Sequence, residues 1–152
     1  MKAVKDILKA KGGEIFSVRP EATLFEALEA MADRNIGSVL VIDKAGEVAG
    51  IFTERDFVRK FMVKGRTGEG TKVEEIMTRR VLYVGPETSI SDCMNLMTEK
   101  RVRHLPVLEN GKPVGVVSIG DIVKAILTEQ ELLITQQASE IGQLERYISG
   151  AI

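Results

Sequence analysis

The chain is built from short apolar runs and from segments in which apolar residues recur every three or four positions. The recurring positions, which predict one face of a helix, are Leu24, Ala27, Leu28 and Met31 and, further on, Ile90, Cys93, Met94 and Met97. The apolar runs, which predict buried strands, cover 15–18, 38–42 and 48–52 and then 81–84, 104–108 and 113–117. Further helices are expected to begin near Glu54 and near Ile119. Each half of the chain therefore predicts the order β-α-β-β-α.

The two halves match position by position, which makes them copies of one unit. The dipeptide Pro20-Glu21 aligns with Pro86-Glu87, an offset of 66 residues. After one deletion the offset becomes 65 and pairs Gly50 with Gly115, Thr53 with Ser118, and Asp56 with Asp121. One unit of about 60 residues buries its sheet face poorly by itself. We therefore predict an α+β fold in which tandem β-α-β-β-α repeats pack sheet to sheet with pseudo-twofold symmetry, leaving two related clefts.

Local signals mark where helices and hairpins begin. Thr23 and Ser89 directly precede the first helix of each unit, and their hydroxyls are predicted N-caps. The dipeptide Asn110-Gly111 separates the last two strands of the second unit, where it predicts a tight hairpin turn.

The chain is predicted to divide into two domains and a helical tail. The first domain covers residues 1–68, including an N-terminal helix, the second covers 69–130, and a C-terminal helical extension covers 131–152. Residues 119–149 hold no proline and, beyond the first turn, one glycine, so they predict one long helix or two. An apolar stripe follows this segment at Ile134, Ala138, Ile141, Leu144 and Ile148. The stripe predicts a dimerisation helix of a homodimer; the alternative is that it folds back on the chain's own core.

Composition narrows the class of protein. A hydrophobic share of 44% with 28% charged residues is typical of a soluble globular chain. Lys plus Arg (21) nearly balance Asp plus Glu (22), and aromatic residues make up 5%, which argues against nucleic acid as a partner. The single cysteine excludes an internal disulfide and favours a reducing compartment. No apolar run is long enough for a signal peptide or a membrane span, so we expect a cytoplasmic protein without a membrane partner.

Each unit ends its last strand with the same chemical pattern. Thr53 is followed three residues later by Asp56, and Ser118 by Asp121, in both cases after a glycine-bearing apolar strand. One interpretation is a helix capping box, in which hydroxyl and carboxylate satisfy free backbone N–H groups. The other is a nucleotide site, since a carboxylate accepts both hydrogen bonds of a ribose diol and the hydroxyl donates to a phosphate or ribose oxygen. The two interpretations are compatible.

The ordered duplication of these features resembles a known family, the CBS-domain pair or Bateman module, in its small stand-alone bacterial and archaeal type. The resemblance covers residues 3–128 and rests on the β-α-β-β-α order, the two strand endings, and the segment 102–107, which reads VRHLPV. It implies binding of an adenosine-containing ligand, such as AMP, ADP, ATP, NAD or S-adenosylmethionine, at one or both clefts. It also implies that Asp56 and Asp121 hold ribose hydroxyls and that Thr53 and Ser118 contact ribose or phosphate.

The phosphate-facing positions of that family differ between the two copies. Arg103 and His104 occupy them in the second unit, where the first has Gly37-Ser38, and the first unit carries Arg55 where the second has Gly120. Arg55, Arg103 and His104 are therefore candidates to converge on a polyphosphate or pyrophosphate, although a lone histidine opening a strand is also often an ordinary, partly buried residue. The predicted binding set is completed by two positions near the purine and in the VRHLPV segment, Val81 and Pro106.

The remaining motifs do not indicate a catalytic or metal-binding site. Residues 65–72 imitate a phosphate-binding loop, but with Thr and Lys in the wrong order, so they predict a linker. Cys93 falls on the apolar face of its helix and predicts a buried structural thiol, and no metal-ligand cluster is evident. We expect a nucleotide-sensing regulatory module that performs no catalysis and signals to an unidentified effector protein. The alternatives are a nucleotide-processing enzyme and a CBS pair with a purely structural or nucleic-acid-interaction role.

Overall fold

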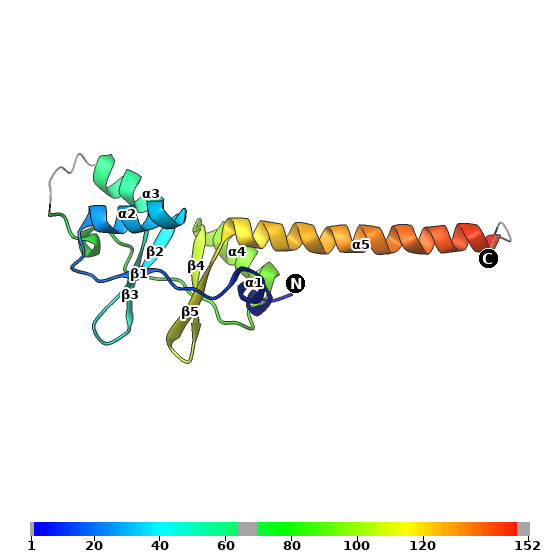
Figure 1. Ribbon diagram of the computed structural model, residues 1–152, viewed down its shortest axis with the longest axis horizontal. Helices are drawn as coiled ribbons and strands as arrows, with labels where there is room; N and C mark the ends of the chain where they lie inside the picture. Colours follow the sequence, from blue (N-terminus) through cyan, green and yellow to red (C-terminus); the bar gives the residue numbers. More distant parts are fainter. Residues whose placement is uncertain (1, 64–69, 149–152) are drawn as a thin grey trace.

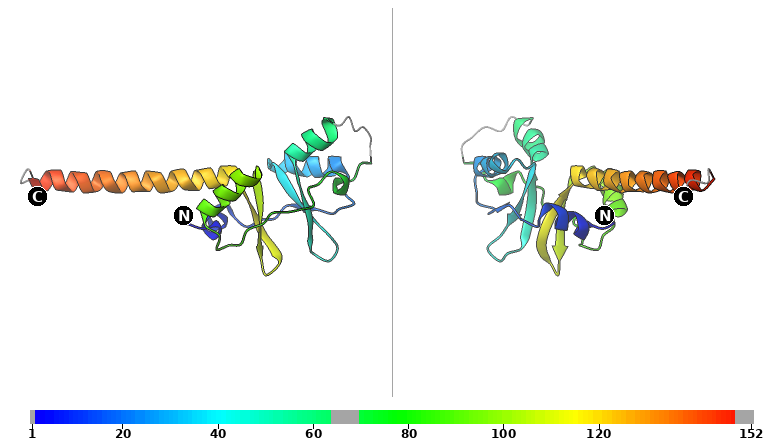
Figure 2. Two further views of the ribbon diagram at one scale, coloured as in Figure 1. Left: turned by 180° about the vertical axis from the view of Figure 1, so that it is seen from behind. Right: turned by 45° about the vertical axis from the view of Figure 1, so that its right-hand side comes forward.

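The two halves of the chain form two adjacent layers, and a long helix projects from the second (Figure 1). The structure is a computed structural model that describes residues 2–63 and 70–148. In both halves two strands form a hairpin that points to the same side of the molecule, and the helices directly before and after each hairpin in the sequence lie at the other end (Figures 1 and 2). The predicted α+β architecture of tandem repeats is confirmed.

The first half is a three-stranded sheet with two helical segments. Strands β1 (Ser17–Val18), β2 (Ser38–Ile42) and β3 (Val48–Thr53) lie in the order β1-β2-β3, with β1 parallel and β3 antiparallel to β2. Helix α2 (Leu24–Arg34) begins at the predicted cap, where the Thr23 hydroxyl accepts the Glu26 N–H at 3.1 Å. The second helical segment runs through α3 (Glu54–Asp56) and continues as the π-helical turn η1 (Phe57–Met62).

The second half repeats this arrangement with a shorter sheet. It contains α4 (Ile90–Lys100), the hairpin of β4 (His104–Glu109) and β5 (Lys112–Ser118), and α5 (Ile119–Ile148). The Ser89 hydroxyl caps α4, as predicted, by accepting the Asp92 N–H at 3.0 Å. Asn110 and Gly111 both have positive φ angles, 52° and 75°, which confirms the expected hairpin turn.

The predicted strand over 81–84 is wrong, because the structure reduces it to one parallel bridge between Val84 and Val107. In the first half, β1 is anchored by the Leu40 N–H, which donates to the Phe16 carbonyl at 3.2 Å. The residue at the position of Leu40 in the second copy is Pro106, which has no N–H to donate. The second half therefore lacks this hydrogen bond, and the segment 81–84 does not form a strand.

The core of each half includes a segment from a distant part of the chain. Helix α1 (Val4–Lys11) packs on the second half, where Val4 and Ile7 join the buried cluster that includes Val107 and Ile122. The 3₁₀ turn η2 (Val73–Glu75) packs on the first half in the same way. The predicted domain boundary at residues 68 and 69 lies outside the described residues, as does most of the predicted linker over 65–72.

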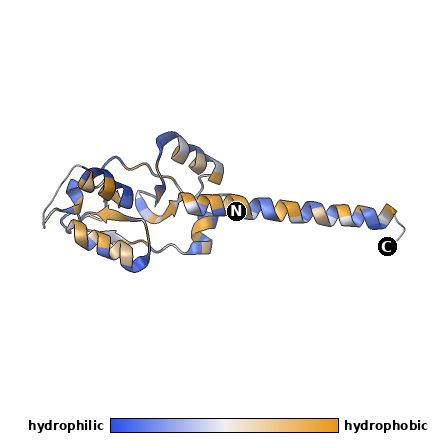
Figure 3. Ribbon diagram, turned by 90° about the horizontal axis from the view of Figure 1, so that it is seen from above, coloured by the Kyte–Doolittle hydropathy of each residue, from blue (hydrophilic) through white to orange (hydrophobic). Residues whose placement is uncertain are grey.

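Helix α5 is one continuous helix of 30 residues, which decides between the one-helix and two-helix predictions. Its first turns pack on α4, β5 and α1, and the remainder leaves the body of the molecule (Figures 1 and 3). The alternative in which the apolar stripe folds back on the chain's own core is wrong, since Ile134, Ile141 and Ile148 are all exposed. No helix among the described residues has the length and apolar character needed to cross a membrane.

Candidate functional site

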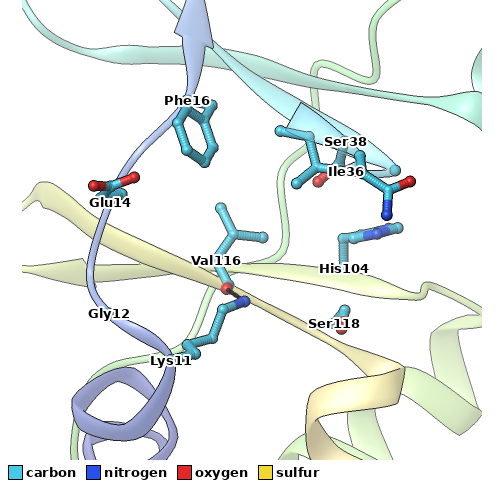
Figure 4. Close-up of a pocket in the computed structure, with 11 residues that line it drawn as sticks. Lys11, Gly12, Glu14, Phe16, Ile36, Ser38, His104, Val116 and Ser118 are labelled. Atoms are coloured by element: carbon cyan, nitrogen blue, oxygen red, sulfur yellow. Dashed lines mark hydrogen bonds between the residues drawn. The ribbon is translucent and has the colours of Figure 1, made fainter. Parts of the chain in front are cut away.

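Two cavities lie between the halves, as the pseudo-twofold arrangement predicts. The first, which we call the basic cavity, has a volume of about 340 Å³ and is lined by the strand-helix corner of the first half and the opposing edge of the second half. The second, which we call the neutral cavity, has a volume of about 540 Å³. Its lining residues are Lys11, Gly12, Glu14, Phe16, Asn35, Ile36, Gly37, Ser38, His104, Val116 and Ser118 (Figure 4). Gly37 and His104 line both cavities.

The capping-box interpretation of both corners is confirmed. The Thr53 N–H donates to the Asp56 carboxylate at 3.0 Å, and the Asp56 N–H donates to the Thr53 hydroxyl at 3.1 Å. The corresponding distances between Ser118 and Asp121 are 2.9 and 3.2 Å. These bonds fix the direction of each carboxylate.

Asp56 is held in place on the wall of the basic cavity by further groups. Its Oδ1 accepts a hydrogen bond from the Thr78 hydroxyl at 3.0 Å and lies 3.2 Å from the Lys60 ammonium. Thr78 is fixed in turn by a pair of backbone hydrogen bonds with Ile51, at 2.8 and 3.0 Å. Only 8% of Asp56 is exposed, and it nevertheless lines the cavity. Sequence reasoning missed Thr78 and Lys60, although the spacing of Lys60, four residues after Asp56, was a visible signal.

The basic cavity carries a strong excess of positive charge. Among the residues that the structure describes, six cationic side chains line it against two carboxylates, those of Glu54 and Asp56. The cations are Arg55, Arg59, Lys60, Arg80, Arg101 and Arg103. The neutral cavity, over the same described ranges, has one cation, Lys11, and one carboxylate, Glu14. The two cavities share their geometry but differ sharply in their electrostatics.

Two of these six cations were candidate site residues in the sequence analysis, and two more could have been found by comparing the charges of the two copies. Arg55 and Arg103, two of the predicted site residues, both line the basic cavity. At the offset of 66 residues, Arg80 stands where the first copy has Glu14, and Arg101 stands where it has Asn35. The difference in charge between aligned positions of the two copies is therefore the signal that marks this side of the cavity.

His104 contributes hydrogen bonding and not charge. Burial lowers its pKa below the ordinary value of 6.5, and this effect outweighs the opposing influence of the Glu54 carboxylate. The imidazole is therefore neutral at pH 7 and presents one donor and one acceptor. A Cβ atom at Gly37 would lie 3.3 Å from His104 Nε2, so the absence of a side chain at Gly37 leaves room for the imidazole between the two cavities.

Three predicted site residues take other positions. Pro106 is buried within β4, and Val81 is flanked by two residues that line the basic cavity, Arg80 and Leu82, without lining it itself. Neither Pro106 nor Val81 is among the described lining residues of either cavity. Asp121 is likewise missing from the described wall of the neutral cavity, to which Ser118 and His104 contribute.

Lys11 is the residue that engages Asp121. Its ammonium donates to the Val116 carbonyl at 3.0 Å (Figure 4) and to Asp121 Oδ2 at 2.8 Å. Burial raises the pKa of Asp121, but the hydrogen bonds from Lys11 and from the Ser118 N–H outweigh burial and hold the pKa below its ordinary value. Asp121 is therefore an ionised carboxylate whose partner is the Lys11 ammonium. No sequence pattern pointed to Lys11.

Cys93 is a buried thiol, as predicted. Burial raises its pKa, with a smaller contribution from the neighbouring Asp92 carboxylate, so the thiolate is disfavoured. Among the described residues there is no group of three or more His, Cys, Asp or Glu side chains arranged to hold a metal ion.

Two similar α+β units that face each other across two cavities define a CBS pair, and comparison with known proteins agrees. The sequence profile of the CBS domain matches residues 4–63 and again 73–128. The chain belongs to the CBS-domain family, whose members are known as regulatory modules that bind adenosine-containing ligands.

Individual proteins are similar to this chain in sequence and in structure. The chain is 38% identical to the mitochondrial CBS domain-containing protein CBSX3 of Arabidopsis thaliana, an alignment that covers 97% of this chain and 72% of the relative. A putative signal-transduction protein with CBS domains from Burkholderia ambifaria is 46% identical, with a TM-score of 0.79 over 84% of this chain and 96% of that structure. A CBS domain pair solved in complex with 5′-methylthioadenosine and S-adenosylmethionine shares the fold at 24% identity, with a TM-score of 0.74 over 84% and 97% of the two chains.

Proposed function

We propose that the chain is an adenine-nucleotide sensor whose basic cavity binds a nucleoside di- or triphosphate, or the pyrophosphate of a dinucleotide. One observation carries this proposal: among the described residues, six cations line a cavity whose wall also presents a fixed, buried carboxylate. A cavity of about 340 Å³ lies within the usual range for small-molecule sites. In this arrangement Asp56 accepts hydrogen bonds from the ribose diol, and the arginines neutralise the phosphate chain.

The cavity also offers an apolar surface for a purine ring. Ile51, Leu82 and Val102 line it beside the charged residues, and they come from both halves of the molecule. The adenine identity of the base is taken from the family, whose members bind adenosine-containing ligands.

Nucleotide binding across the two halves supplies a mechanism of regulation. Asp56 and Arg55 belong to the first half, while Arg80 and Arg103 belong to the second, so a single ligand contacts both. Binding therefore favours one relative orientation of the halves, by as much as the affinities for the two orientations differ. We propose that this change is passed to a separate effector protein in the cytoplasm and that no reaction takes place.

The proposal is tested by the thermal unfolding of the chain with ATP, ADP, AMP, NAD, S-adenosylmethionine and adenosine. A ligand at 100 times its Kd stabilises the native state by about 2.7 kcal/mol, which raises the unfolding midpoint by about 5–10 °C. We expect ATP and ADP to exceed AMP, and AMP to exceed adenosine, because the cations act on phosphate. Equal shifts for ATP and adenosine, or no shift with either, would contradict the proposal, and product analysis after incubation with ATP tests the enzymatic alternative.

We also propose that α5 joins two copies of the chain. Leu127, Ile134, Ile141 and Ile148 follow one another at intervals of seven residues, the spacing of a coiled-coil seam. All four side chains are exposed on the isolated chain. A second copy presents the same stripe at the same seven-residue spacing, so two copies can bury each other's stripe, which makes a second copy the occupant that fits.

Substitution of Ile134→Lys together with Ile141→Lys is expected to convert a dimer into a monomer of 16.7 kDa. The two side chains are 65% and 56% exposed, so the folded body of the chain does not depend on them. Light scattering coupled to size exclusion measures the mass. The matched control, Gln136→Lys with Gln143→Lys, places the same charges at the same spacing on another face of α5 and should leave the dimer intact. A dimer that survives the first pair of substitutions would show that α5 is not the interface.

A further inference from the structure

The two halves complete equivalent corners with different chemical groups. In the first half, the Thr78 N–H donates to the Ile51 carbonyl at 2.8 Å and the Thr78 hydroxyl donates to Asp56 Oδ1 at 3.0 Å. Backbone and side chain of one residue thus fix the strand and the carboxylate together.

In the second half a single ammonium takes over both of these contacts. Val116 and Asp121 are the counterparts of Ile51 and Asp56 at the offset of 65 residues. Lys11 Nζ donates to the Val116 carbonyl at 3.0 Å and to Asp121 Oδ2 at 2.8 Å. The group that completes this corner is therefore the end of a long side chain, which can leave, and not a backbone segment.

This exchange changes what faces the cavity. Asp56 lines the basic cavity together with its partners Thr78 and Lys60. In the neutral cavity Lys11 is among the lining residues, while Asp121 is not among the described ones (Figure 4). Among the described lining residues, the neutral cavity therefore meets the Lys11 ammonium, which is bonded to Asp121, and not Asp121 itself.

We propose that Lys11 is an intramolecular competitor for nucleoside at the neutral cavity, and that it decides how many nucleotides the chain binds tightly. This inference rests on the proposed function. The basic cavity binds first, and a nucleoside enters the neutral cavity only by displacing Lys11 from Asp121. The N-terminal segment of the chain thereby controls the second site.

The surroundings of Lys11 allow its release without unfolding. Lys11 is the last residue of α1, which Val4, Ile7 and Leu8 anchor to the core, and it is followed by Gly12 with a φ of 90° and by Gly13, so that its side chain can turn away while α1 stays in place. The side chains of Lys11 and Asp121 are 41% and 24% exposed, so solvent screens the pair to a moderate degree. Such an ion pair, with the additional bond to the Val116 carbonyl, is expected to weaken nucleoside binding by about tenfold.

The test compares Lys11→Met with the wild-type chain in calorimetric titrations with adenosine and, separately, with ATP. Adenosine isolates the competition for the carboxylate, because it has no phosphate that Lys11 itself would attract. We expect a second adenosine-binding event about tenfold tighter in Lys11→Met than in the wild type, with ATP binding at the basic cavity unchanged. Adding Asp121→Asn to Lys11→Met should remove the gain.

Two control variants address charge and folding. Lys9→Met removes the same charge from the same helix at an exposed position and should change neither event. Lys11→Arg retains a cation that reaches Asp121 and should behave as the wild type. Lys11→Gln replaces Lys11→Met if the methionine variant proves less stable.

The outcomes separate this inference from the proposed function. If the second adenosine event has the same affinity in Lys11→Met and in the wild type while ATP binds the basic cavity, the competitor role is overturned and the sensor function stands. If Lys11→Met gains an Asp121-dependent adenosine site while no variant binds ATP at the basic cavity, the competitor role stands and the proposed function falls. If no variant binds adenosine or ATP, both are overturned.

Discussion

Arg103→Glu is expected to weaken the binding of ATP by about 100-fold while leaving the binding of adenosine nearly unchanged. Arg103 lines the basic cavity from the second half, opposite Arg55 of the first. A charge-assisted hydrogen bond to phosphate contributes about 1.5–3 kcal/mol. The reversed charge removes this contact and repels the phosphate chain, so about 3 kcal/mol, or a factor of about 100, is the expected loss. Titration calorimetry with both ligands measures it.

The specificity of this effect is checked by a remote charge reversal. Lys44→Glu makes the same change of charge at an exposed position in the hairpin between β2 and β3, away from the basic cavity, and should leave both ligands unaffected. The side chain of Arg103 is exposed, so its replacement is not expected to disturb folding. Equal losses for ATP and adenosine would indicate a damaged fold, and an unchanged affinity for ATP would show that the phosphates do not lie beside Arg103.

Gly50→Ala is expected to lower the free energy of unfolding by about 2–3 kcal/mol, the cost of overpacking a site that cannot relax. A Cβ atom at Gly50 would lie 2.7 Å from the Thr78 carbonyl oxygen and 2.7 Å from the sulfur of Met77. The sulfur belongs to a side chain that can turn away, but Thr78 is fixed by its backbone bonds to Ile51. Denaturant titration measures the loss, which corresponds to a midpoint about 4–12 °C lower in a thermal scan.

The matched control is Gly115→Ala, the equivalent position in the second half. A Cβ atom there would meet the side chain of Leu8, with Cδ2 at 2.6 Å and Cδ1 at 3.3 Å. Because these atoms end a flexible side chain, rotation of Leu8 relieves the contact and the expected cost is about 1 kcal/mol. If both substitutions lowered the free energy of unfolding equally, the Thr78 backbone would move as easily as the Leu8 side chain, which would contradict the rigid role of Thr78.

Much of the candidate site was predictable because the repeat supplies an internal alignment. The pairing of Thr53 with Ser118 and of Asp56 with Asp121 identified both corners, and the structure gives each the expected capping bonds. The charge difference between the cavities was only partly predicted. Arg59 lies one turn beyond Arg55 along the same helical segment, and its contribution depends on how that helix is oriented toward the second half.

What the sequence determined by itself was every feature that depends on local spacing. The apolar pattern located the helices and every predicted strand except that at 81–84, the hydroxyl residues Thr23 and Ser89 located two helix starts, and Asn110-Gly111 located a hairpin. These features follow from backbone geometry and hydrogen bonds within a few residues, so the amino acids in a short window are sufficient.

Only the tertiary structure decided which distant segments complete each half. Helix α1 packs on the second half, and Lys11, rather than Lys9, reaches Asp121. The absence of a strand at 81–84 likewise depended on the pairing of this segment with β4, where Pro106 has no N–H to donate. Such contacts join positions up to about 110 residues apart, as between Lys11 and Asp121. These contacts depend on how the apolar faces of whole units pack together and on the entropy of closing the loops between them. A short window of sequence contains neither quantity.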